Sequence, residues 1–384
     1  TPKMSDTAAA GLRTEIVDAR RIVVKVGSSS LTDASGALDM MKLEALVDAL
    51  AATRARGQDV VLVSSGAMAS GMGPLRMKHR PRDLASKQAA AAVGQSLLVG
   101  RYGTLFARFG LTVGQVLLTA EDVARHDHYR NALRTFTRLI ELGVVPIVNE
   151  NDTVATHEFR FGDNDRLAAL VAHLVGADAL VLLSDVDALY TAHPSNPDAR
   201  PIRLVTDIDE LDVDTSGRGT EVGTGGMETK LQAARIASAS GIPAVLASAE
   251  AVADALSGRE VGTLFRPTGK RRSRKLMWLA YASVSQGELV LDAGAVKAVT
   301  QMKASLLPAG IIEARGSFVT GDPVRLVSES GTVVARGLVA YDSTDLPAII
   351  GKSTRDLVAE LGPQFDREVV HRDDLIVRHR KRKP

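Results

Sequence analysis

From Arg21 to Ala247, hydrophobic and polar positions follow a repeating pattern. Short runs of β-branched and aliphatic residues are each followed by a polar or glycine-containing loop and then by a longer helical stretch. The apolar runs are IVVKV (22–26), VVLV (60–63), TVGQVLL (112–118), VVPIV (144–148), ALVLL (179–183) and IPAVLA (242–247), and the helical stretches lie near 39–56, 84–109, 121–142, 164–175 and 227–240. Continuous apolar runs are typical of strands buried on both faces. The pattern predicts an α/β fold, a three-layer αβα sandwich with a mainly parallel central sheet.

After the stretch GTLFRPTGKRRSRK (262–275) the pattern changes. Short β-patterned pieces such as WLAY (278–281) and ELVLD (288–292) are separated by turn glycines. Such pieces are typical of a small β-barrel-like domain. The predicted organisation is a disordered N-terminal extension (1–20), an α/β catalytic domain (21–265), a basic linker (266–285), the small β-domain (286–366) and a C-terminal segment with a basic tail (367–384).

Composition narrows the class of protein. The 384 residues are 45% hydrophobic and 24% charged, with a mean hydropathy of +0.04 and a formal net charge of +2. The chain contains no cysteine, which excludes disulfides, thiolate metal sites and cysteine nucleophiles. No apolar run reaches the roughly 18–20 residues of a membrane span, and the N-terminus lacks the apolar region of a secretory signal. We therefore expect a cytoplasmic protein that is not associated with a membrane.

The loops that follow four of the predicted strands are rich in small, hydroxyl and acidic residues. They read GSSS (27–30), SSGAMASG (64–71), NEND (149–152) and SDVD (184–187). Each loop alone is explained by turn and capping chemistry. Together they indicate a ligand crevice, because open α/β sheets bind ligands beyond the carboxyl ends of their strands.

Two lysines point to an anion in that crevice. Lys25 stands near the end of a strand that should be buried, where a lysine either extends its ammonium group outward to solvent or faces an anion, and its place at the carboxyl end of the strand favours the anion. The second lysine, Lys230, ends the stretch GTGGMETK (223–230). This stretch places glycines and the lysine at the start of a helix, where backbone N–H groups and the helix dipole favour anions. It is not a Walker A loop, which requires G-x-x-x-x-G-K-[ST]. A flexible hinge with a solvent-exposed lysine is the alternative.

The acidic segment FGDND (161–165) precedes an apolar helical run and carries more carboxylates than capping requires. It could hold magnesium, a substrate ammonium or the two lysines. The HDH sequence at 126–128 does not match a structural zinc site, since no third ligand is evident. Two lysines, a glycine-rich helix start and clustered carboxylates, with no histidine at the strand ends, favour phosphoryl transfer. A carboxylate acceptor is already ionised at pH 7, so the reaction would need no general base.

At this point the motifs resemble those of the glutamate 5-kinase family of the amino acid kinase superfamily. They are VVKVGSSSLT, VLVSSGAMASG, VPIVNENDTVA, FGDNDRLAAL, LLSDVDALYTAHP and GTGGMETKLQAARIA. The C-terminal SLLPAGIIEARGSFVTGDPVRL resembles a PUA domain. The resemblance implies ATP-dependent phosphorylation of the side-chain carboxylate of L-glutamate to L-glutamyl 5-phosphate, the first step of proline biosynthesis.

The resemblance also implies roles for individual residues. Lys25, Lys230 and Asp165 would be catalytic, with Asp165 holding both lysines. Glutamate would be bound by Ser65, Asp152, Asp163 and Asn164. The nucleotide would be contacted by Lys25, Ser184, Asp185, Thr224, Gly225, Gly226, Met227, Glu228, Thr229 and Lys230.

The same resemblance implies further partners. Mg²⁺ would arrive with ATP, so no dedicated metal ligands are expected. A homo-oligomer (dimer or tetramer), feedback inhibition by L-proline and a separate glutamyl phosphate reductase downstream are also implied. Two alternatives stay open. The acceptor could be N-acetylglutamate or aspartate, or the chain could be an RNA-binding module whose kinase-like domain is a scaffold or a proline sensor. The basic clusters at 270–275 and 378–384 are more typical of a solvated charge run than of an RNA site.

Overall fold

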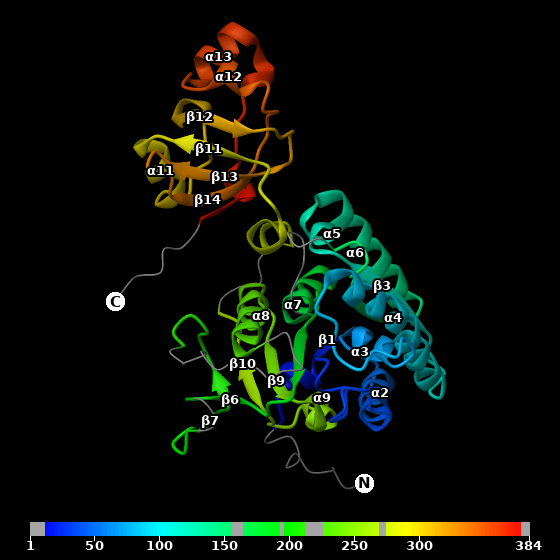
Figure 1. Cartoon of the computed structure of the whole chain (residues 1–384). Helices are drawn as coiled ribbons and strands as arrows, with labels where there is room; N and C mark the ends of the chain where they lie inside the picture. Colours follow the sequence, from blue (N-terminus) through cyan, green and yellow to red (C-terminus); the bar gives the residue numbers. More distant parts are fainter. Residues whose placement is uncertain (1–11, 156–163, 193–195, 212–225, 269–273, 378–384) are drawn as a thin grey trace. The chain divides into compact units, whose positions relative to one another are not determined.

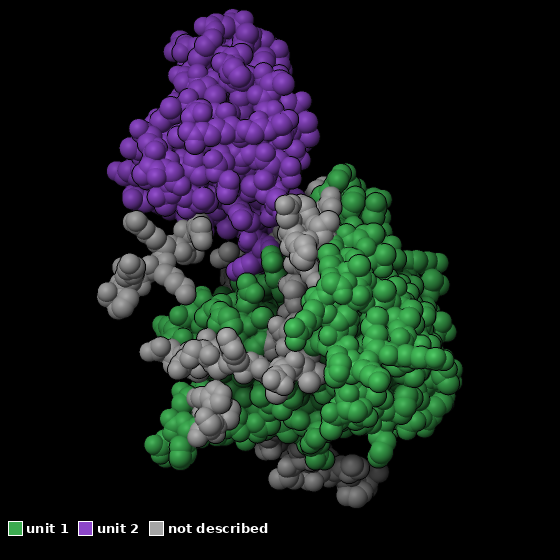
Figure 2. Space-filling model, in the orientation of Figure 1, with its two compact units in different colours: residues 1–272 green, residues 273–384 purple. Residues whose placement is uncertain are grey.

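The computed structural model describes residues 12–155, 164–192, 196–211, 226–268 and 274–377. The chain divides into two compact units, residues 1–272 and residues 273–384, which Figure 2 shows in different colours. The division falls inside the range 266–285 that the sequence assigned to a linker. Each unit has its own hydrophobic core and is described separately below.

The first unit is built on an eight-stranded sheet with the order β3-β4-β2-β1-β5-β9-β10-β8. Its strands are β1 (Arg21–Val26), β2 (Asp59–Ser64), β3 (Val113–Leu118), β4 (Val145–Glu150), β5 (Ala179–Ser184), β8 (Leu204–Val205), β9 (Ala244–Ser248) and β10 (Thr263–Phe265). All neighbouring pairs are parallel except β9 and β10. A short hairpin of β6 (Leu189–Tyr190) and β7 (Pro201–Ile202) lies outside this sheet. The predicted mainly parallel sheet is confirmed.

Helices cover both faces of this sheet (Figure 1). The described helices are α1 (Thr14–Val17), α2 (Met40–Ala55), α3 (Ala67–Met72), α4 (Leu84–Ala107), α5 (Ala120–Ala124), α6 (His126–Glu141), α7 (Asn164–Val175), α8 (Met227–Ala239) and α9 (Val252–Leu256). Ile22, Val24 and Val26 of β1 share a core with α2, α4 and α9. The alternate residues of β1 face the other side, where α7 packs on β1 and against α8. This is the predicted three-layer αβα sandwich.

Two sequence expectations in this unit need correction. TVGQVLL (112–118) was expected to be buried on both faces, but β3 is the edge strand and its residues are mostly only half-buried. A run of apolar residues does not distinguish an edge strand from a central one. The single helix expected near 121–142 is two helices, α5 and α6, which are separated at Arg125.

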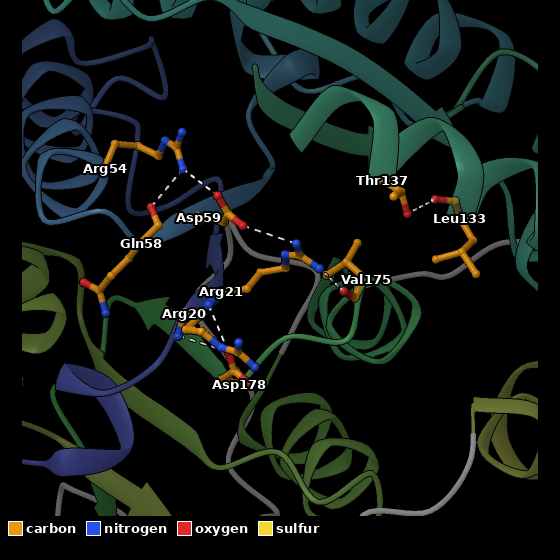
Figure 3. A network of polar contacts seen from close by, with 9 residues as sticks. All are labelled: Arg20, Arg21, Arg54, Gln58, Asp59, Leu133, Thr137, Val175 and Asp178. Carbon is orange, nitrogen blue, oxygen red and sulfur yellow. Dashed lines mark hydrogen bonds and ion pairs between the residues drawn. The ribbon is translucent and has the colours of Figure 1, made fainter. Parts of the chain in front are cut away.

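Polar contacts tie together the starts of β1, β2 and β5, an end of the sheet that we call the amino edge (Figure 3). Asp59 accepts hydrogen bonds from the guanidinium of Arg21 at 3.2 Å and from that of Arg54 at 2.7 Å. The side chain of Asp178 accepts hydrogen bonds from the backbone N–H groups of Arg20 and Arg21, both at 3.0 Å. The strand starts are therefore fixed by groups that lie at the opposite end of the sheet from the loops singled out in the sequence.

The second unit contains a five-stranded sheet with the order β12-β11-β13-β14-β15. Its strands are β11 (Gly287–Leu291), β12 (Ile311–Gly316), β13 (Pro323–Ser328), β14 (Val333–Leu338) and β15 (Leu375–Val377). The described helices are α10 (Arg274–Met277), α11 (Ala293–Thr300), α12 (Leu346–Ile349) and α13 (Thr354–Leu361). The WLAY segment, expected to be extended, lies instead in a π-helical turn, Trp278–Ala282, and Trp278 is buried. Burial, rather than alternation, explains its apolar composition.

Candidate functional site

The carboxyl ends of four strands meet at one edge of the first unit, which we call the carboxyl edge. Strand register places Val26 of β1 beside Ser64 of β2 and beside Leu183 of β5. Glu150 of β4 lies beside Leu118 of β3. The loops that the sequence singled out, at 27–30, 64–71, 149–152 and 184–187, therefore start from the same edge, as expected for an open α/β sheet.

A buried carboxylate joins the two lysines at this edge. Lys25 Nζ lies 2.5 Å from Asp165 Oδ1, and Lys230 Nζ lies 3.5 Å from Asp165 Oδ2. Asp165 stands in the first turn of α7 and has no exposed surface, while Lys25 and Lys230 are 4% and 8% exposed. Thr229 Oγ1 donates a further hydrogen bond to Asp165 Oδ2 at 3.0 Å. The three elements β1, α7 and α8 thus converge on one charged cluster that contains Lys25, Lys230 and Asp165.

Electrostatics keep Asp165 ionised in spite of its burial. Desolvation raises the pKa of this carboxyl, but the charges of Lys25 and Lys230 and the hydrogen bonds from Lys25 and Thr229 outweigh it, so the pKa lies below its usual range. Held by Asp165, the ammonium groups of Lys25 and Lys230 lie close together at the carboxyl edge, and such paired cations suit an anionic ligand.

Hydrogen bonds connect a second group of polar side chains near the ends of β2 and β4. Asn164 Nδ2, in the residue before Asp165, donates to Ser65 Oγ at 2.8 Å and to Asn149 Oδ1 at 2.9 Å. Asn149 Nδ2 donates in turn to Gln95 Oε1 of α4 at 2.8 Å. Ser65 and Asn164 were singled out from the sequence, and the structure brings them together.

Three residues of this region were missed by the sequence reasoning, namely Asn149, Gln95 and Gln88. Gln88 Nε2 donates to the backbone carbonyl of Asp152 at 2.9 Å and so holds the loop that carries this aspartate. A signal for all three was present. Asn149 begins the NEND motif, and Gln88 and Gln95 are seven residues apart, a spacing that places both on one face of α4.

A pocket adjoins Ser184 and Asp185, at the ends of β1, β5 and β9. Its volume is about 420 Å³, within the range of small-molecule sites. It is lined by residues of four segments, including Ser29, Ser30, Met41, Lys42, Ser184, Asp185 and Ser248. Ser30 is 6% exposed, and its Oγ makes no hydrogen bond with any of the described residues. A buried hydroxyl without a partner points to a ligand that supplies one.

The start of α8 presents Met227, Glu228 and Thr229 after the N-cap residue Gly226, which has no side chain that could cap the helix. The backbone N–H groups and the dipole at a helix start favour an anion. Thr224 and Gly225, predicted to contact the nucleotide, and Asp163, predicted to bind glutamate, lie outside the described residues.

Neither a cluster of metal-ligating side chains nor a membrane-spanning helix is found among the described residues. No group of three or more histidine, aspartate and glutamate side chains there could hold a metal ion. In the HDH sequence, His128 Nδ1 lies 3.0 Å from Asp122 Oδ1. None of the described helices combines the length and the apolar character that a bilayer crossing requires.

Known proteins match both units of the chain. The profile of the Amino acid kinase family matches residues 20–248, and that of the PUA domain matches residues 287–361. A protein of Streptomyces coelicolor named glutamate 5-kinase is 58% identical over 96% of this chain and 100% of its own length. A glutamate 5-kinase of Salinispora arenicola is 58% identical over 95% of this chain and 100% of its own length. A solved isopentenyl phosphate kinase superposes with a TM-score of 0.46 and 18% identity, over 64% of this chain and 99% of its own.

Proposed function

We propose, from the premise that this chain belongs to the amino acid kinase family and within it to the glutamate 5-kinases, that it transfers the γ-phosphoryl group of ATP to the side-chain carboxylate of L-glutamate. The product is L-glutamyl 5-phosphate, the first intermediate of proline biosynthesis. The observation that carries the proposal is the buried cluster in which Asp165 lies between Lys25 and Lys230.

The cluster supplies what phosphoryl transfer requires. The reaction passes through a state in which charge spreads over the oxygens of the moving phosphoryl group, and catalysis depends on positioned positive charge. Lys25 and Lys230 would face these oxygens from opposite sides. Asp165, ionised and buried, would hold both ammonium groups in place before the nucleotide binds. The acceptor carboxylate is ionised at neutral pH, so no proton has to be removed from it.

Glutamate would bind beside this cluster. Ser65 and Asn164 are hydrogen-bonded to each other, and Asn164 precedes Asp165 directly, so a ligand on these two side chains lies next to the lysines. We place the acceptor there, with Asp152 and Asp163 facing its ammonium group. This arrangement requires a free ammonium, which glutamate has and N-acetylglutamate lacks.

ATP would extend from the lysines across the carboxyl edge. Ser184, Asp185 and residues 224–230 would contact the nucleotide. We place its base and ribose in the pocket beside Ser184, where the Ser30 hydroxyl makes no hydrogen bond with the described residues. Mg²⁺ bound to the phosphates would supply further charge neutralisation. An ion carried by the nucleotide keeps several of its waters and needs only one or two protein ligands.

Other properties are proposed on the family resemblance alone. They are inhibition by L-proline, a homo-oligomeric assembly, a cytoplasmic location, transfer of the labile product to a glutamyl phosphate reductase, and RNA binding by the PUA domain.

The decisive experiment traps the acyl phosphate. The protein is incubated with ATP, Mg²⁺ and hydroxylamine, and hydroxamate formation is followed with L-glutamate, L-aspartate or N-acetyl-L-glutamate as the acceptor. We expect product with L-glutamate only. A folded protein that gives no more hydroxamate with glutamate than without an acceptor contradicts the proposal. If hydroxamate forms with aspartate or N-acetylglutamate instead, that compound and not glutamate is the substrate.

A further inference from the structure

We propose that Gln95 is a positioning residue for the amino acid acceptor, because its oxygen anchors the side chain of Asn149 in a hydrogen-bond chain that ends on Ser65. The inference rests on the proposed function. Gln95 does not reach the proposed glutamate site itself. It acts through Asn149 and Asn164, which lie between it and Ser65.

The direction of the chain is set by a group that can only donate. The backbone N–H of Glu150 lies 2.8 Å from the side-chain oxygen of Asn149. An amide NH₂ in that place would face another donor, so the oxygen of Asn149 must point toward this N–H. Its Nδ2 then points toward Gln95, which must offer an oxygen, and its Oδ1 faces the Nδ2 of Asn164.

The chain assigns opposite roles to the two groups at its end. Asn164 Nδ2 donates to Ser65 Oγ, so the hydroxyl hydrogen of Ser65 points elsewhere and can be donated to a ligand. Asn164 Oδ1 accepts no hydrogen bond from the described residues and is left as an acceptor. A hydroxyl donor suits a carboxylate, and an amide acceptor suits an ammonium. The pair therefore matches the α-carboxylate and α-ammonium of an amino acid, with the carboxylate on Ser65.

Burial makes this directionality strong. Asn149 and Gln95 are 4% and 9% exposed, so water does not compete with the chain at these two residues. Gln95 Nε2 is buried and makes no hydrogen bond with the described residues. What Gln95 contributes is thus its oxygen. Gln95 is brought close by the tight approach of α4 to α3, where a Cβ on the neighbouring Gly94 would lie 1.6 Å from the carbonyl oxygen of Ala67.

Two substitutions of similar size distinguish the role of the Gln95 oxygen, as a hydrogen-bond acceptor, from the role of the side chain in packing. Gln95→Met removes the oxygen, whereas Gln95→Glu keeps one. We expect Gln95→Met to raise the KM for glutamate about tenfold, the effect of losing one oriented hydrogen bond. The kcat of this variant and its KM for ATP should stay within about twofold of the wild-type values, which is less than the loss of one hydrogen bond would cause. Gln95→Glu should restore most of the glutamate affinity. Ser96→Ala, on the exposed side of the same helix, serves as the control, and thermal unfolding verifies that each variant is folded.

The outcomes distinguish the two levels of the proposal. Active wild-type protein with an unchanged glutamate KM in Gln95→Met overturns the positioning role and leaves the proposed function intact. The same holds if both variants lose glutamate affinity equally, or if Gln95→Met lowers kcat alone. Wild-type protein that neither forms hydroxamate nor binds glutamate by calorimetry overturns both.

Discussion

Lys25 and Asp165 form an ion pair of 2.5 Å between the central strand β1 and the first turn of α7, with both side chains almost fully excluded from water. Removing the charge of Asp165 leaves two ammonium groups close together without their shared partner. We expect Asp165→Asn to lower kcat by about 100-fold, as for other losses of a group that organises transition-state charge. The hydroxamate assay measures it. Asp178→Asn at the amino edge is the matched control, and an equal loss of kcat there would contradict a specific role for Asp165.

The same ion pair makes stability depend on pH. The pKa of Asp165 is lowered in the folded protein, so its contribution is fully present above the unfolded value of about 3.9 and is lost as the pH falls through the folded value. We expect the stability difference between wild type and Asp165→Asn to be largest at neutral pH and to shrink below about pH 4. Denaturant unfolding at a series of pH values measures this difference. Parallel curves for the two proteins would contradict the expectation.

Lys230 differs from Lys25 in being 3.5 Å from the shared carboxylate and in standing on α8, next to the glycine-rich loop. We expect Lys230→Met to lower kcat by about 100-fold or more, because the variant loses the ammonium group that would stabilise the negative charge on the moving phosphoryl group. Glutamate affinity, measured by calorimetry, should remain close to that of wild type. Lys352→Met is a suitable control because Lys352 forms an exposed pair with Glu360 in the second unit. Loss of glutamate affinity with kcat retained would refute the role.

The pocket beside Ser184 offers a test of where the nucleoside binds. Ser30 is buried in its wall, so Ser30→Leu fills part of the space. We expect a higher KM for ATP and an unchanged KM for glutamate. Ser35→Ala, in an exposed turn of the same loop, is the control. If the KM for ATP does not change in a folded Ser30→Leu protein, the base and ribose bind elsewhere.

The contact of α3 with α4 depends on glycine. A Cβ on Gly94 would lie 1.6 Å from the carbonyl oxygen of Ala67, whereas a Cβ on Gly100 of the same helix would meet no atom within 4 Å. We expect Gly94→Ala to destabilise the protein by about 3 kcal/mol or more through overpacking. Gly100→Ala should stabilise it by about 0.5–1 kcal/mol, since alanine is the better helix former. Denaturant unfolding of both variants compares them, and equal effects would contradict the close contact.

Much of this arrangement could be predicted from the sequence. The apolar runs gave the strands of the central sheet, and the loops after them gave the edge at which polar residues meet, because strand ends in a parallel sheet face the same way. Lys25 was anomalous within a buried strand, and that anomaly pointed to an anion. The structure pairs this lysine with Asp165 at 2.5 Å.

What escaped the sequence depends on contacts between distant residues. Asn149 and Gln95 are 54 positions apart, and their hydrogen bond requires α4 to be rotated so that one face looks toward the end of β4. Local periodicity gives the face of a helix but not its neighbour. The prediction of an extended WLAY segment was wrong for a related reason, since a short apolar run fits a buried helical turn as well as a strand.

The amino edge separates one part of the stability of this sheet from its chemistry. Arg21, Arg54, Asp59 and Asp178 hold the strand starts through side chains that are partly open to solvent. Lys25 follows Arg21 by four residues on β1, about 13 Å along the strand. A substitution at the amino edge is therefore expected to change stability without moving the lysine.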